Sequence, residues 1–182
     1  PIAGSEVSGP ENGKLNLFEK KWCILIKGRR TNKKHLQFLR SFWKKMGSRT
    51  VEMTSEKHDK IFSITSHLPH LIAYNIVSTA ADIENVTKSD VIKYSASGFR
   101  DFTRIAASDP TMWRDILLSN KDSLLEVISR FSEDLSMLQK AIRWEDGETL
   151  YKLFSKTRKI RNKIIDAGQD VSVPDFGRSK KK

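Results

Sequence analysis

The sequence is poor in cysteine, with Cys23 as the single one among 182 residues. One cysteine cannot form an internal disulfide, which fits the reducing environment of the cytoplasm. Cys23 lies in an apolar run, so we expect a buried structural thiol rather than a nucleophile. Long apolar runs are also missing, since none approaches the ~20 residues that a membrane span needs. These absences predict a cytoplasmic protein with no membrane partner.

Acidic residues are scarce beside basic ones, 22 against 33, which gives a net charge of +11. Such an excess requires that a nucleic-acid partner be considered. The basic residues concentrate in short runs at 28–34, 158–163 and 178–182, without the interleaved aromatic residues that stacking on bases requires. We therefore predict no nucleic-acid partner. A basic surface that serves solubility or attracts an anionic substrate is the better interpretation.

An initiator methionine is absent too, because the chain opens on Pro1. The first residues have neither the basic region nor the apolar region of a signal peptide. We expect from this a processed or truncated chain. Hydrophobic residues make up 38% of the sequence, which is sufficient for a packed core.

The first third of the chain has the pattern of an α/β domain. Residues 22–27 form a short apolar run that ends at Gly28 and predicts a buried strand. Thr31 or Asn32 can cap the helix that follows, and Gly47 can end it. Residues 50–54 alternate in polarity and predict a second strand. This strand–helix–strand order suits the last part of an α/β domain.

From Ser55 onward the pattern is helical. Pro69 should bend the first long helix or start a new segment, because it lacks a backbone donor. Asp109 followed by Pro110 is a strong helix start, and a last helix is predicted at about 148–167. A stripe with alternating spacings of four and three calls for a partner helix in the same chain or in another subunit. Its members are Leu124, Ile128, Phe131, Leu135, Leu138 and Ile142.

Three of the four histidines, His58, His67 and His70, fall within thirteen residues. A zinc site usually has a clearer set of three or four ligands, so we predict no metal and expect capping or hydrogen-bonded imidazoles here. A second cluster alternates arginine with aspartate around Asp101 and Arg104. It can be a salt-bridged helix face, but arginine also binds carboxylates through two parallel hydrogen bonds. Together the clusters suit a small dianion.

Several segments of the chain resemble the prephenate dehydrogenase family. They are PIAGSEVSGPENG, LFEKKWCIL, HDKIFSITSHLPHLIAY, GFRDFTRIAASDPTMWRDI and DAGQDVSVPDFGR. They occur in the family's order and cover nearly the whole chain. The last of them is similar to versions described as cyclohexadienyl dehydrogenases, which accept prephenate, arogenate or both.

The resemblance implies a mainly α fold, with an all-helical dimerisation domain after the last strand–helix–strand part of a Rossmann domain. Residues 1–54 would be the Rossmann remnant, residues 55–168 the helical substrate-binding and dimerisation domain, and residues 169–182 a basic flexible tail. The cofactor would be NAD or NADP, bound mainly upstream, since no GxGxxG pattern occurs in this sequence. The implied assembly is a homodimer.

The resemblance also implies site residues. His70 and Arg104 match positions that bind substrate in the family, and Glu6 matches an acidic residue that can pair with that arginine. Asp101 and Trp113 match residues that support or line the site. Ser97 stands where relatives often have glycine, a change that a contact to substrate through the backbone tolerates. For all six residues a purely structural role is the alternative.

The implied reaction is the oxidative decarboxylation of prephenate or arogenate in tyrosine synthesis. The family's catalytic histidine would directly precede Pro1, so no residue of this chain is assigned as catalytic and we expect the chain alone to be inactive. The alternative is a non-catalytic helical dimerisation or interaction module, which would need neither His70 nor Arg104.

Overall fold

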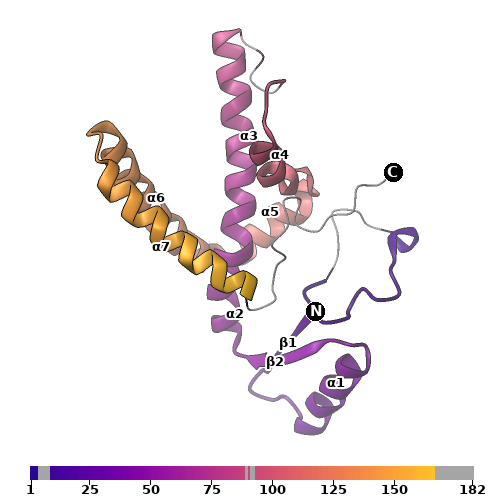
Figure 1. The fold of residues 1–182 in the computed structure, drawn as a ribbon. Coiled ribbons are helices and arrows are strands. Elements are labelled where there is room, and N and C mark those ends of the chain that lie inside the picture. The colour runs from indigo at the N-terminus through magenta and orange to yellow at the C-terminus, as the bar shows by residue number, and fades with distance from the viewer. Residues whose placement is uncertain (4–8, 89, 91–92, 167–182) are drawn as a thin grey trace. The chain divides into compact units, whose positions relative to one another are not determined.

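The computed structural model describes residues 1–3, 9–88, 90 and 93–166, and for Asn12, Ile165 and Asp166 it describes the backbone alone. Contacts divide the chain into two compact units, Pro1–Ile128 and Ser129–Lys182. None of the helices in the described ranges combines the length and the apolar character that crossing a membrane would take. The helical predominance predicted from the pattern is confirmed, and a two-stranded sheet stands at the start of the first unit (Figure 1).

The chain begins with a loop that contains a short 3-10 turn, η1 (Pro10–Asn12), and then forms a βαβ unit. Strand β1 (Trp22–Ile26) and strand β2 (Arg49–Met53) pair in parallel, with Cys23 opposite Thr50. Cys23 and Leu25 are buried while their neighbours along β1 are more exposed, as the alternation of side chains in a strand requires. The prediction of a buried thiol at Cys23 is thus confirmed.

Helix α1 (Lys33–Lys45) connects the two strands. Of the two predicted caps, Asn32 is the one used, because its Oδ1 accepts a hydrogen bond of 2.8 Å from the backbone N–H of Lys34. Gly47 follows the helix with φ +84°, a conformation that glycine adopts without steric cost. Both ends of the predicted helix are therefore set by the residues expected from the sequence.

Three consecutive helical segments follow β2: α2 (Ser55–Phe62), the π-helical turn η2 (Ser63–His67) and α3 (Leu68–Thr87). Thr54 caps α2 by accepting a hydrogen bond from the N–H of Lys57. Pro69 has the predicted effect, since α3 begins next to it and the N–H of Leu68 bonds to the carbonyl of Ser63, five residues back. The widened turn accommodates a proline without ending the helical path.

The next part of the chain lies against α3 (Figure 1) and comprises α4 (Ser97–Thr103), the 3-10 turn η3 (Arg104–Ala107) and α5 (Pro110–Ser119). Asp109 caps α5 as predicted, with its Oδ1 2.7 Å from the N–H of Met112. The hydroxyl of Tyr74 on α3 donates a hydrogen bond of 2.7 Å to the carbonyl of Ser108. This bond fixes the connection that leads into α5.

Helices α6 (Lys121–Arg143) and α7 (Gly147–Asp166) complete the described chain. They are joined by three residues that include Glu145, whose φ is +54°, and Asp146 accepts a hydrogen bond from the N–H of Thr149 at the start of α7. The predicted last helix is confirmed to within a residue at each end. The second unit therefore consists, in its described part, of most of α6 followed by α7.

Candidate functional site

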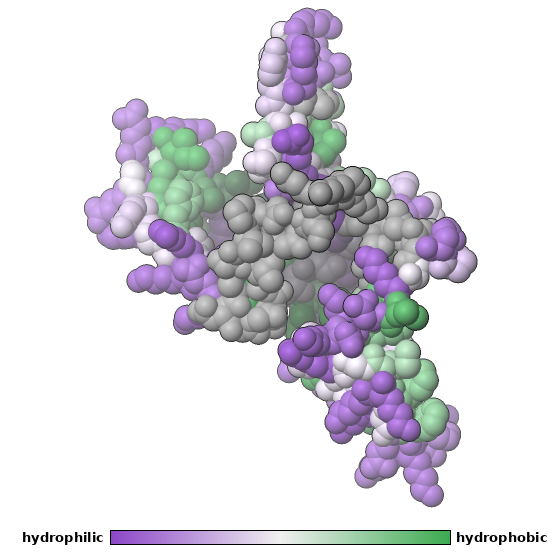
Figure 2. Space-filling view, turned by 45° about the vertical axis from the view of Figure 1, so that its right-hand side comes forward, coloured by the Kyte–Doolittle hydropathy of each residue, from purple (hydrophilic) through white to green (hydrophobic). Residues whose placement is uncertain are grey.

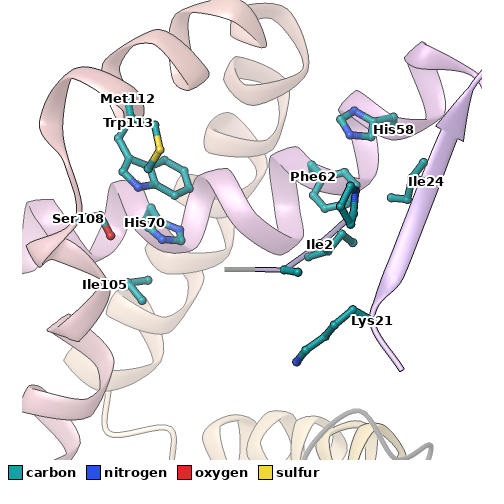
Figure 3. Close-up of a pocket in the computed structure, with 12 residues that line it drawn as sticks. Ile2, Lys21, Ile24, His58, Phe62, His70, Ile105, Ser108, Met112 and Trp113 are labelled. Atoms are coloured by element: carbon teal, nitrogen blue, oxygen red, sulfur yellow. The ribbon is translucent and has the colours of Figure 1, made fainter. Parts of the chain in front are cut away.

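A cavity of about 640 Å³ opens in the first unit, between the N-terminal segment with β1 and the helices α2, α3 and α5 (Figure 3). Its lining is largely apolar, with imidazole, hydroxyl, indole and ammonium groups distributed around it. Such a mixture is typical of a small-molecule site. The residues that line it are Pro1, Ile2, Ala3, Lys21, Ile24, His58, Phe62, His70, Ile105, Ser108, Met112 and Trp113.

His70, on the first turn of α3, stacks on Trp113 of α5 with ring centroids 3.5 Å apart and an interplanar angle of 18°. Its Nδ1 lies 2.8 Å from the carbonyl oxygen of Ser66. Because a carbonyl only accepts, Nδ1 carries the proton, and Nε2 of the neutral ring is an acceptor. The ring is thus fixed in both plane and tautomer.

Burial lowers the pKa of His70 from its ordinary value of 6.5, while the hydrogen bond to Ser66 acts in the opposite direction. Neutral His70 therefore dominates at pH 7. Protonation would turn Nε2 into a donor, which a carboxylate ligand would favour by its charge. The geometry gives this residue two ways of contacting a ligand, as an acceptor when neutral and as a charged donor when protonated.

His67 stands behind the cavity wall in a separate hydrogen-bond arrangement. The side-chain amide of Asn120 donates to His67 Nδ1 at 3.1 Å and to the backbone carbonyl of Asp59 at 2.9 Å. The pKa of His67 is lowered mainly by burial, with further lowering from the nearby His58 and His70 and a raising effect from Asp59. His67 is therefore a neutral structural group that connects α2, η2 and the end of α5.

Trp113 is 7% exposed, and its Nε1 has no hydrogen-bond partner among the described residues. Besides its stack on His70, it meets His67 edge-on at a centroid distance of 6.4 Å. The indole thus packs against both histidines of the SHLPH segment. This packing gives the apolar wall of the cavity its position.

His58 and Phe62 form the opposite side of the cavity, one turn apart on α2. Their rings lie 4.5 Å apart at 36°, and His58 Nδ1 donates to the carboxylate of Asp59 at 2.9 Å. We expected His58 to be a capping or core group, and the sequence reasoning missed its place in the cavity wall. The spacing of four between His58 and Phe62 is the signal that places both on one helical face. No such pattern exists for Lys21 or Ser108, which precede a strand and a helix.

Among the predicted site residues, the structure brings His70 and Trp113 into direct contact at the cavity. Ser97 and Asp101 lie on α4, and Arg104 is the exposed first residue of η3, directly before Ile105 of the lining. Those three do not line the cavity in this structure. Glu6 falls outside the described residues. Among the described residues, no group of three His, Cys, Asp or Glu side chains is placed to hold a metal ion.

Comparisons with known proteins match the chain in two consecutive parts. Residues 1–52 match the sequence pattern of the prephenate dehydrogenase nucleotide-binding domain. Residues 54–156 match that of the prephenate dehydrogenase dimerization domain. The second match alone covers more than half of the chain.

Individual relatives agree with this assignment. The chain is 38% identical over 161 residues to a cyclohexadienyl dehydrogenase from Zymomonas mobilis, covering 88% of this chain and 55% of that protein. It is also 38% identical over 176 residues to a prephenate dehydrogenase from Bacillus subtilis, covering 97% of this chain and 47% of that protein. The chain thus spans about half the length of the curated relatives it matches.

Solved structures show the same fold. A prephenate dehydrogenase from A. aeolicus, in complex with hydroxyphenyl propionate and NAD+, superposes with a TM-score of 0.85 at 40% identity. The match covers 90% of this chain and 57% of that one. The predicted fold class, helices preceded by a piece of a Rossmann-like domain, is confirmed by this similarity and by the βαβ unit.

Proposed function

Because the chain belongs to the prephenate dehydrogenase family, we propose that it serves the NAD(P)-dependent oxidative decarboxylation of prephenate or arogenate in tyrosine synthesis. The observation that carries the proposal is the stack of His70 on Trp113 in the wall of the cavity. It combines a flat apolar surface with a positioned ring nitrogen. A cyclohexadiene ring that bears carboxylates needs both kinds of contact.

The substrate would be held by the helical part of the chain. The apolar lining, to which Trp113 belongs, would exclude water from the ring of the substrate. His70 orients it through Nε2, and Arg104 at the start of η3 would bind a carboxylate by charge-assisted hydrogen bonds. Glu6 would pair with that arginine, Asp101 on α4 would support the site, and Ser97 at the start of α4 would contact substrate through its backbone. Such placement contributes to the rate mainly through orientation.

The chain's residues do not by themselves fit the nicotinamide cofactor. A dinucleotide site needs a glycine-rich turn between a strand and a helix, whereas the turn after β1 contains the single glycine Gly28, followed by Arg29 and Arg30. We therefore assign no residue of this chain to NAD or NADP. The domain match and the NAD+ complex of the A. aeolicus relative support a cofactor of this class for the protein.

The partner proposed for the chain is a second copy of itself. Residues 54–156 match a domain described as a dimerization domain. Large apolar side chains on α6 and α7 are exposed, among them Leu135, Ile142 and Phe154 (Figure 2). A homodimer would cover them. We place the helical substrate-binding and dimerisation domain at 55–168, the Rossmann remnant at 1–54 and a basic tail at 169–182.

Binding tests the substrate side of the proposal directly. The purified chain is titrated with prephenate and with hydroxyphenyl propionate, and binding is measured by calorimetry and by tryptophan fluorescence. A Trp113→Phe variant, which keeps the other three tryptophans, shows which part of the fluorescence change comes from Trp113. We expect saturable binding of both ligands, weakened about tenfold by His70→Asn because an oriented hydrogen bond from the imidazole to the ligand is lost. The exposed His35 of α1 provides the matched control, His35→Asn.

The absence of binding by the unaltered chain would contradict the proposed substrate site. Equal binding by the unaltered chain and by His70→Asn would favour a helical interaction module over a substrate-binding role. The reaction itself is measured with the full product of the gene that encodes this chain, as prephenate-dependent formation of NADH or NADPH. Failure to reduce either cofactor would reject the proposed activity.

A further inference from the structure

Lys21, directly before β1, belongs to the lining of the cavity (Figure 3). Its backbone is fixed on both sides. The N–H bonds to the carbonyl of Phe18 at 3.2 Å, and the carbonyl accepts a hydrogen bond of 2.8 Å from the N–H of Arg49. These two hydrogen bonds hold the backbone of Lys21 in place at the cavity, so that only its side chain is free to move.

The lining gives this ammonium group an unusual electrostatic setting. Among the described residues of the lining, no side chain is a carboxylate, and Lys21 is the one with a permanent positive charge. At the other end of the strands, by contrast, Lys27 and Arg40 both pair with Glu52. Lys21 has no ion-pair partner among the residues that the structure describes. An unpaired cation in the lining of a largely apolar cavity attracts an anionic ligand.

Prephenate and arogenate, the two candidate substrates, differ in one functional group that would interact with the ammonium group of Lys21. Prephenate carries two carboxylates and a keto group in its side chain, whereas arogenate carries an ammonium in place of the keto group. A second ammonium close to Lys21 costs repulsion, and the described lining offers no carboxylate to neutralise it. A keto acid suffers neither penalty.

We propose that Lys21 binds a substrate carboxylate and makes the cavity select prephenate, a keto acid, over arogenate, the corresponding amino acid. The inference rests on the proposed function of the same cavity and adds a specificity-determining residue to it. Lys21 contacts substrate from the side of β1, and the stack of His70 on Trp113 lies on the side of α3 and α5. The selection operates by attraction of the keto acid and by repulsion of the amino acid.

The test compares the binding of prephenate and arogenate by calorimetry at pH 7.5, in the unaltered chain and in four variants. Lys21→Gln and Lys21→Glu remove and reverse the charge, and Lys21→Arg keeps it. Lys20→Gln is the matched control, because Lys20 is the exposed neighbouring lysine and does not line this cavity. Circular dichroism confirms that each variant keeps the helical content of the parent.

We expect the unaltered chain and Lys21→Arg to bind prephenate at least tenfold more tightly than arogenate. Lys21→Gln should weaken prephenate binding about tenfold and leave arogenate binding nearly unchanged, and Lys21→Glu should reverse the preference. Lys20→Gln should behave as the parent. Raised salt should reduce the preference in the parent and not in Lys21→Gln.

The outcomes separate the inference from the proposed function. If the unaltered chain binds neither compound, the substrate site itself is wrong. If it binds prephenate but Lys21→Gln keeps both the affinity and the preference, the site stands and the role of Lys21 is wrong. Tighter binding of arogenate than of prephenate by the unaltered chain would also overturn the inference.

Discussion

Two histidines near the cavity, His67 and His70, lie in surroundings that oppose their protonation. Burial lowers the pKa of both His67 and His70, and Asn120 donates to His67 Nδ1, the position that a second proton would need. Stacking on Trp113 keeps His70 away from water on one face. The neutral forms are therefore part of the folded structure.

This setting predicts a dependence of stability on pH. The unfolded chain binds protons at these imidazoles near the ordinary pKa of 6.5, whereas the folded chain resists them. Stability is thus full above pH 6.5 and falls as the pH drops from 6.5 through the lowered pKa values of the folded state. Thermal unfolding followed at pH 7.5 and pH 5.0 should show a lower midpoint at the acidic pH.

His67→Gln should reduce this difference between the two pH values, since it removes one of the two groups. His35→Gln, on the exposed side of α1, should leave the difference as it is in the parent. A midpoint that rises between pH 7.5 and pH 5.0 would contradict the assignment of neutral, buried imidazoles.

At the scale of elements, much of the fold follows from local chemistry that the sequence displays. Asn32, Asp109 and Gly47 set helix ends where their side chains or their freedom of φ predicted. Pro69 marks the junction that became a π-helical turn, because the missing donor of a proline has a local effect. The kind of turn was not predictable, since it depends on how α2 and α3 pack.

Residues of the candidate site were predictable from the sequence where a chemically distinctive residue type stands in a recognisable motif. Other residues of the cavity lining were not predictable in this way. His70 and Trp113 were predicted as site residues, and the structure brings them together although they are distant in the sequence. Lys21 and Ser108 reach the cavity through the pairing of β1 with β2 and through the bond from Tyr74. Such tertiary placement leaves no periodic signal in a sequence, so a lysine in a basic chain is indistinguishable from its neighbours.

Gly47 supports a prediction about the βαβ unit. Its φ of +84° disfavours any residue with a Cβ, and an added Cβ would lie 3.2 Å from Cα and 3.0 Å from Cγ of Glu19. Gly47→Ala should therefore lower the free energy of unfolding by about 1–2 kcal/mol, measured by urea denaturation. Gly147→Ala is the control, because no φ strain is present there and open space surrounds the new Cβ. It should be neutral or stabilising, and an equal loss in both variants would contradict the argument.

At the scale of the whole molecule, large apolar residues are left at the surface of α6 and α7. The predicted stripe begins with Leu124, which is 5% exposed, and continues to Leu135 and Ile142, which are 54% and 65% exposed. A face that starts in a core and runs out into solvent is stable only when another surface covers it. On α7, Tyr151 and Phe154 are also exposed and need a covering surface for the same reason.

The proposed homodimer would cover this surface, and self-association can therefore be tested by substitution. Light scattering after size exclusion should give twice the chain mass of 20.9 kDa for the parent. Leu135→Glu places a charge in the stripe and should give a monomer, because an unpaired buried carboxylate costs several kcal/mol. Ser136→Glu adds the same charge at the next, polar position of α6 and should leave the dimer intact. A parent that stays monomeric at tens of micromolar, or an equal loss of the dimer in both variants, would remove the basis for the dimer.

The thermal midpoint should also rise with protein concentration in the parent and stay constant in Leu135→Glu, since association stabilises only the folded state.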